Sequence, residues 1–183
     1  MRLKNSRLHW GMVAIFFHWF IVILVGTQFY LIYHFDQLPR HAADKIPTIL
    51  LHKSVGMTIL AIVVLRLLWR LANTVPSLPA DLSWWLKLMA KANHFLLYAR
   101  LFIVPATGYL MTGFSGRSLH VFGVAVPMLV SANKSYSGLF SQIHSTCAFG
   151  FLGLICLHFT AVMYHQFIRK DSILSRMLPW GKQ

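Results

Sequence analysis

The sequence is poor in charge, and poorest in acidic residues. Only 11% of its 183 residues are charged, and no more than four are aspartate or glutamate. A soluble domain of this size needs more polar surface than a chain that is 57% hydrophobic, with a mean hydropathy of +0.60, can supply. The composition therefore excludes an ordinary soluble domain and indicates an integral membrane protein.

Cysteine is also scarce, and the two cysteines cannot pair with each other. Cys147 and Cys156 are nine residues apart in one apolar stretch, which is about 900° of helix rotation and places them on opposite faces. The sequence has no C-x-x-C-H motif, which excludes covalent attachment of a c-type haem. A P-loop and a G-x-G-x-x-G motif are absent too, so the sequence carries neither of these nucleotide-binding signatures.

Long apolar runs are what the sequence has in abundance. Four of them, at residues 11–33, 49–69, 86–112 and 138–168, each approach or exceed the roughly 20 residues that a membrane-crossing helix requires. Four such helices leave no room for a second domain. We therefore predict an all-α fold, a transmembrane four-helix bundle, in which residues 1–183 form a single integral-membrane domain surrounded by lipid.

The net charge is +13, and most of the charged residues lie between the apolar runs or at their ends. The basic residues form no stripe with aromatic side chains, so the pattern predicts no nucleic-acid partner. They gather before the first run, around the second connection and after the last run, and the positive-inside rule places such segments in the cytoplasm. We predict that both termini are cytoplasmic and that the first and third connections lie outside. The basic residues of the cytoplasmic segments are Arg2, Lys4, Arg7, Arg66, Arg70, Lys87, Lys91, Arg169, Lys170, Arg176 and Lys182.

Three histidines lie in the last apolar run, where a titratable side chain is unusual. The 14 steps from His144 to His158 total about 1400°, which is about 40° short of whole turns, and the seven steps to His165 are within about 20° of two turns. All three imidazoles therefore share one helix face. At about 1.5 Å per residue, His144 and His158 are about 21 Å apart, most of the thickness of the hydrocarbon core.

Histidines in the other runs match these two depths. Under the predicted topology, His52 lies in the outer half with His144, and His18 lies in the inner half with His158. Two facing imidazoles at each depth suit a haem iron in an electron-transfer protein, which needs two strong axial ligands. Zinc fits less well, because it prefers four ligands that often include cysteine or a carboxylate. Hydrogen bonding between helices and a histidine-lined metal carrier remain alternatives.

The motifs around these histidines resemble a known family. "HWF" at His18, "LHKSVG" around His52, "IHS" at His144, "LHFTA" at His158, and the following His165 resemble the bacterial four-helix cytochrome b561 family. The resemblance covers nearly the whole chain, and the 14-residue spacing is its most specific part. The same arrangement appears in the membrane cytochrome b subunits of formate dehydrogenase and nickel-iron hydrogenase.

The resemblance implies a di-haem b-type cytochrome of the bacterial inner membrane, with ubiquinone as substrate. His18 and His158 look like axial ligands of the inner haem, and His52 and His144 like those of the outer haem. In one branch of the family, superoxide is oxidised at the outer surface and electrons pass to ubiquinone near the inner surface. The resemblance thus implies a superoxide:ubiquinone oxidoreductase.

Two further residues enter through the same resemblance. His165 lies where that branch has a quinone-site histidine, and Trp19 is a plausible neighbour in that pocket. The rival function is a membrane relay between quinone and a separate dehydrogenase or periplasmic redox protein. The sequence leaves the roles of Arg100 and His94 open: Arg100 is a charge in the middle of the third run, and His94 lies near its start.

Overall fold

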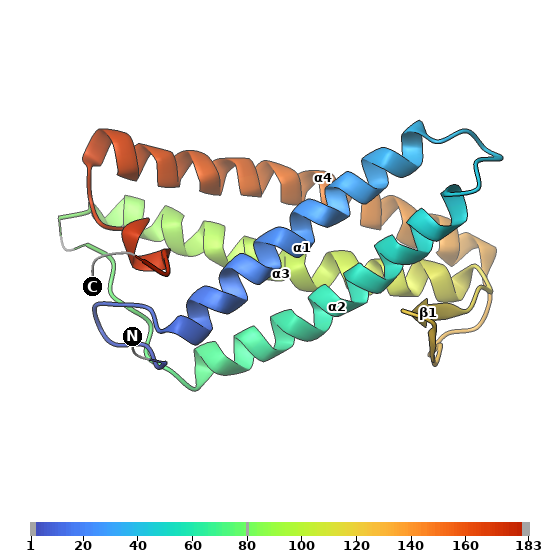
Figure 1. Ribbon diagram of the computed structural model, residues 1–183, viewed down its shortest axis with the longest axis horizontal. Coiled ribbons are helices and arrows are strands. Elements are labelled where there is room, and N and C mark those ends of the chain that lie inside the picture. Colours follow the sequence, from blue (N-terminus) through green and yellow to red (C-terminus); the bar gives the residue numbers. More distant parts are fainter. Residues whose placement is uncertain (1–2, 80, 181–183) are drawn as a thin grey trace.

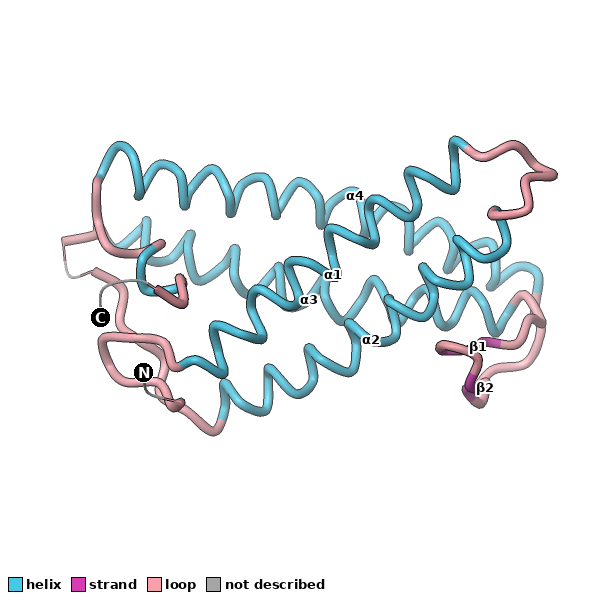
Figure 2. Tube along the Cα trace, in the orientation of Figure 1, coloured by secondary structure: helices cyan, strands magenta, loops and turns pink. Residues whose placement is uncertain are grey.

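Four long helices dominate the structure, a computed structural model that describes residues 3–79 and 81–180 (Figures 1 and 2). Arg2 and Lys182, which the charge pattern assigns to the cytoplasmic side, lie outside these residues. The helices are α1 (Met12–Gln37), α2 (Lys45–Leu71), α3 (Trp84–Phe114) and α4 (Lys134–Met163). All four are long and apolar enough to cross a membrane. The predicted four-helix membrane bundle is therefore confirmed.

The helices extend beyond the apolar runs because polar groups satisfy their ends. At the start of α4, the Asn133 side chain accepts a hydrogen bond from the Tyr136 backbone N–H at 3.1 Å, as an N-cap residue should. At the end of α1, the Lys45 ammonium donates to the carbonyl oxygens of Phe35 and Leu38, which no longer have partners within the helix. The same lysine begins α2, so it ties the first two helices together.

The bundle consists of two antiparallel helix pairs. α1 packs on α2, α3 packs on α4, and the two pairs meet mainly through α2 and α3. Figure 1 shows both termini at one end of the bundle and the α1–α2 connection at the other. We call these the terminal end and the loop end. Both termini thus lie on one side of a membrane that the four helices cross.

Most of the buried apolar side chains form one cluster between the helices, and others, such as Leu82 and Leu119, lie in the connections. α4 is the least buried helix, and among its described residues only Phe151 is buried. Large apolar side chains such as Phe149, Phe159 and Leu157 are exposed on α4, where lipid can cover them. The buried cluster consists of Ile21, Val25, Leu31, Val55, Ile59, Val63, Leu101 and Phe151.

A short β-hairpin at the loop end is an addition to the predicted all-α fold. β1 (Leu119–Val121) pairs antiparallel with β2 (Val124–Val126), and both turn residues, Phe122 and Gly123, have positive φ (48° and 87°), as a tight two-residue hairpin requires. The Phe122 N–H donates to the Ser54 hydroxyl oxygen at 3.0 Å. The hairpin is therefore anchored to α2 two residues after His52.

At the terminal end, hydrogen bonds join the residues before α1, the α2–α3 connection and the residues after α4. The Asn5 side chain donates to the Thr74 carbonyl at 2.9 Å, and the Ser77 N–H donates to the Arg7 carbonyl at 3.1 Å. Beyond α4 the helix continues as a π-helical segment (Tyr164–Arg169), and a 3-10 helix follows at Ser175–Met177. After α4 the chain thus turns back toward α1 at the terminal end.

Candidate functional site

The structure brings the depth-matched histidines into two pairs. His18 of α1 lies beside His158 of α4 with 6.4 Å between ring centroids. His52 of α2 lies beside His144 of α4, with 6.3 Å between ring centroids. One partner in each pair comes from α4, because the 14-residue spacing repeats the same helix face. The axial-ligand assignment itself stays a prediction, but each predicted partner is where a shared group would need it.

The separations fit a metal ion held between two rings. Two imidazoles that shared one metal ion, each with a metal–nitrogen distance of about 2.0–2.1 Å and a nitrogen about 1.2 Å from its ring centre, would have centroids about 6.4–6.6 Å apart. The separations of 6.4 Å and 6.3 Å lie at or just below this range. His94 of α3 is closer to His158, at 5.3 Å between centroids, and does not match it. Instead, His94 Nδ1 donates to the Ala90 carbonyl of its own helix at 2.6 Å.

The hydrogen bonds of the loop-end pair also suit an axial ligand. His144 Nδ1 is 2.9 Å from the Val104 carbonyl oxygen, so this nitrogen donates and leaves the Nε2 lone pair free. His52 Nδ1 is buried without a hydrogen-bond partner, and so is the Gln28 side-chain oxygen nearby, whose amide donates to the His52 carbonyl. Unpartnered buried polar atoms of this kind are expected where a further group binds.

The terminal-end pair matches in distance but has a competing contact. Arg66 Nη2 lies 3.2 Å from His18 Nδ1. A guanidinium only donates, so His18 Nδ1 accepts, and the proton of the neutral ring is then on Nε2. Binding of iron through Nε2 therefore requires this proton to leave and the contact with Arg66 to change. Arg66, one of the basic residues that flank the second connection, belongs to the last two turns of α2.

Two features between or beside the pairs were missed or left open by the sequence. Gly108 of α3 packs on the His144 ring: a Cβ at this position would lie 3.1 Å from His144 Cε1. Arg100 lies against Gly150 of α4, where a Cβ would be 3.4 Å from the guanidinium. Gly150 falls between His144 and His158, so Arg100 places a positive charge at a depth between the two pairs.

The two residues predicted near a quinone are both tied to the C-terminal segment. The Trp19 indole N–H donates to the Met177 carbonyl at 2.7 Å, so it is not free for another acceptor. His165 Nδ1 lies 2.5 Å from an oxygen of Asp171. No hydrogen bond or ring contact joins Trp19 to His165 in the described part of the chain. The structure therefore anchors both side chains at the terminal end without placing them in one contact.

Asp171 is a residue at this end that no sequence motif marks. Partial burial acts to raise the pKa of its carboxyl group, but hydrogen bonds from His165, the Ile173 N–H and Arg169 outweigh burial and lower the pKa overall. Arg169 also pairs with Asp81 of the α2–α3 connection. The sequence does contain a clue to Asp171: acidic residues are scarce, and this one lies six residues after His165.

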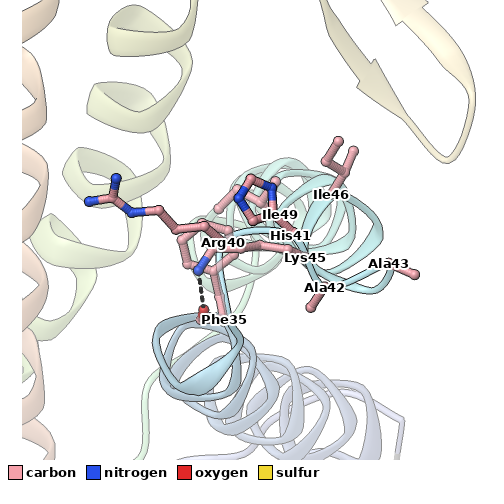
Figure 3. Close-up of a pocket in the computed structure, with 8 residues that line it drawn as sticks. All are labelled: Phe35, Arg40, His41, Ala42, Ala43, Lys45, Ile46 and Ile49. Atoms are coloured by element: carbon pink, nitrogen blue, oxygen red, sulfur yellow. Dashed lines mark hydrogen bonds between the residues drawn. The ribbon is translucent and has the colours of Figure 1, made fainter.

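The loop end contains a shallow hollow of about 570 Å³ around the α1–α2 connection (Figure 3). Arg40, His41 and Lys45 supply its polar lining, and in Figure 3 the Arg40 side chain extends away from the others. Within residues 3–79 and 81–180, no three histidine, cysteine or acidic side chains converge as ligands of a bare metal ion. The metal-carrier alternative therefore gains no site from the described residues.

Comparison with known proteins confirms the family resemblance. Residues 9–180 match the family described as prokaryotic cytochrome b561. The chain is 29% identical to cytochrome b561 homolog 2 of Escherichia coli (strain K12), over 97% of this chain and 95% of that protein. It is 27% identical to cytochrome b561 homolog 1 of the same strain, over 92% and 96%.

A third relative carries a functional name. The chain is 26% identical to a Yersinia pestis protein named "Probable superoxide oxidase CybB", over 88% of this chain and 91% of that protein. The family match spans the four membrane helices and all five histidines of the quoted motifs. The chain therefore belongs to the prokaryotic cytochrome b561 family and is a multi-pass membrane electron-transfer protein of the kind that binds haem b.

Proposed function

We propose that the protein oxidises superoxide at one face of the bacterial inner membrane and reduces ubiquinone at the other. The observation that carries the proposal is that four histidines form two pairs, with 6.4 Å and 6.3 Å between ring centroids. His18 and His158 would hold one haem b, and His52 and His144 the other. Each haem, when bound, would supply a one-electron carrier.

The overall reaction balances without an acid or base at the superoxide side. Two superoxide ions each give up one electron and leave as O₂, while one ubiquinone takes up two electrons and two protons and leaves as ubiquinol. Protons are therefore needed only where the quinone is reduced. The proposal places this step at the terminal end, which the positive-inside rule assigns to the cytoplasm, with residues 1–183 acting as one domain.

Positive charge at the loop end supports the choice of a small anion as donor. Arg40 and Lys45 lie at the hollow of the α1–α2 connection, and Lys53 and Arg117 lie close enough for their charges to repel each other. An excess of positive charge raises the encounter rate with a small anion. The relative named as a probable superoxide oxidase supports the same donor.

Stopped-flow spectroscopy of the purified, haem-loaded protein tests the proposal. We expect superoxide to reduce the haems rapidly, added ubiquinone to reoxidise them, and one ubiquinol to form for about two superoxide ions consumed. A pyridine haemochrome assay should give about two haems per chain, with no covalently bound haem. Absence of reduction by superoxide would contradict the donor assignment.

The same experiment separates the rival function. A protein that ignores superoxide but exchanges electrons with quinol and with a dehydrogenase or periplasmic redox protein is a relay. In that case the proposed haem ligands would remain valid, but superoxide would not be the electron donor. His144→Ala is a useful comparison, because it removes one ligand at the loop end and should abolish reduction from that side.

A further inference from the structure

Asp171 and His165 form a hydrogen-bonded pair at the terminal end of the bundle. The Asp171 oxygen lies 2.5 Å from His165 Nδ1, and the two side chains are 19% and 18% exposed. The pair is built by the end of the helix: Lys170 adopts a left-handed conformation (φ 54°), which turns the chain back. The Asp171 N–H then donates to the His165 carbonyl at 3.2 Å. The carboxylate is thus fixed by the backbone against the imidazole that precedes it.

This contact determines where the ring proton of His165 lies. The lowered pKa of Asp171 keeps its carboxyl ionised at neutral pH, and an ionised carboxylate only accepts hydrogen bonds. His165 Nδ1 must therefore carry the proton, and Nε2 of the neutral ring is a lone-pair acceptor. A neutral His165 cannot donate to a quinone oxygen through Nε2. Only its imidazolium form can do so.

Asp171 also contacts a second charged side chain. Arg169 Nε lies 3.4 Å from the same Asp171 oxygen, and its terminal nitrogen pairs with Asp81. The Tyr164 ring also faces His165, with 5.8 Å between centroids. Arg169 thus links the Asp171–His165 pair to the α2–α3 connection. Two of the four acidic residues of this strongly basic chain are placed here.

We propose that His165 delivers a proton to the quinone through Nε2 and that Asp171 is the positioning residue that makes this possible. The inference rests on the proposed function, because it needs quinone reduction at the terminal end. In each transfer the Nε2–H bond breaks and a quinone O–H bond forms, while an electron from superoxide reaches the quinone. His165 returns to the neutral Nδ1–H form, and water on the cytoplasmic side restores the Nε2 proton. Two such transfers accompany the two electrons that form ubiquinol.

The test uses Asp171→Asn in the full-length, haem-loaded protein, with Asp36→Asn as a matched control. Asp36 lies near the end of α1 at the loop end, so its substitution removes the same charge far from His165. Reduction with dithionite followed by mixing with ubiquinone measures the quinone step alone. We expect reoxidation about 10-fold or more slower in Asp171→Asn, since a positioned general acid contributes about 10²–10⁴-fold. Asp36→Asn and the haem spectra should be unchanged.

A second readout does not depend on activity. Nitrogen-15 NMR of histidine-labelled protein, with the His165 signal identified by its loss in His165→Gln, reports which ring nitrogen is protonated. We expect Nδ1–H in the unaltered protein and in Asp171→Glu, and a shift to Nε2–H in Asp171→Asn, whose amide can donate to Nδ1. Unchanged tautomer and unchanged reoxidation in Asp171→Asn would overturn the inference.

The design also separates this inference from the proposed function. If superoxide fails to reduce the protein but the dithionite-reduced protein shows the Asp171 effect, the donor is wrong and the proton relay stands. If superoxide reduces the protein and Asp171→Asn behaves like Asp36→Asn, the relay is wrong and the donor stands. Should Asp171→Asn load haem poorly, the solvent deuterium isotope effect on reoxidation of the unaltered protein decides. A slowing in D₂O that Asp171→Glu retains supports the relay, and no slowing contradicts it.

Discussion

Gly108→Ala is the sharpest test of the loop-end histidine pair. A Cβ at Gly108 would lie 3.1 Å from His144 Cε1 and 3.2 Å from Nδ1, closer than an ordinary van der Waals contact. The ring would have to move by a few tenths of an ångström. The hydrogen bond from His144 Nδ1 to the Val104 carbonyl, now 2.9 Å long, depends on the present ring position.

Two effects of this substitution oppose each other, and their sizes decide the outcome. Alanine in place of glycine inside a helix stabilises the helix by about 0.5–1 kcal/mol. Loss of the hydrogen-bond partner of a metal-binding histidine lowers metal affinity by about 10–100-fold, which is about 1.4–2.7 kcal/mol. We therefore expect a protein whose helices are no less stable, yet whose loop-end haem is held about 10–100 times less tightly. The terminal-end haem should be unaffected.

Transfer of haem to a scavenging apoprotein, followed optically, measures this affinity. Gly26→Ala is the control, since a Cβ at that position meets nothing within 4 Å. It should gain the same helix stability and keep both haems. The reasoning is refuted if Gly108→Ala loses haem no faster than Gly26→Ala.

Three other outcomes follow from the described contacts. His144→Ala should remove the loop-end redox transition and His158→Ala the terminal-end one, each leaving the other intact in a potentiometric titration. Asn133→Ala should destabilise α4 by about 1 kcal/mol through loss of its N-cap bond, whereas Ser83→Ala should be nearly neutral, because Ser83 makes no side-chain cap bond to α3; denaturant titration of helicity compares them. The pKa of Asp171 is lowered from its ordinary 3.8 despite burial. The stability that its carboxylate gives to the segment after α4 is therefore complete above about pH 4, and it is lost as pH falls through the lowered pKa. At low pH, amide hydrogen exchange of residues 171–178 in the unaltered protein should become as fast as in Asp171→Asn. A difference in exchange rate between the two proteins that stays constant down to pH 2 would contradict this.

The helices and the histidine pairing were predictable because both follow from periodicity and length. An apolar run of about 20 residues must cross the membrane, and alternating crossings then fix the depth of each histidine. Since His144 and His158 share one face, their partners had to come from helices facing it. His52 and His18 are those partners in the structure.

The remaining contacts depend on how the connections fold, which periodicity does not report. Arg66 follows the rule for a cytoplasmic charge yet lies within α2, with its head group on His18. Asp171 meets His165 only because Lys170 reverses the chain in a left-handed conformation, which few non-glycine residues adopt. The β-hairpin depends on a Phe-Gly turn in which only the glycine is a usual turn residue.

The use of one helix to hold a ligand of each pair makes the distance between the two sites a discrete quantity. A single residue inserted between His144 and His158 would rotate one imidazole by about 100° away from its partner, whatever else it did. Only additions or deletions close to a full turn keep both side chains on the same face. The separation can therefore change in steps of about 5.4 Å, from about 21 Å to about 16 or 26 Å, and not gradually. Any gradual adjustment of electron transfer between the sites has to come from what surrounds them, such as the charge of Arg100, because their spacing is quantised by the helix.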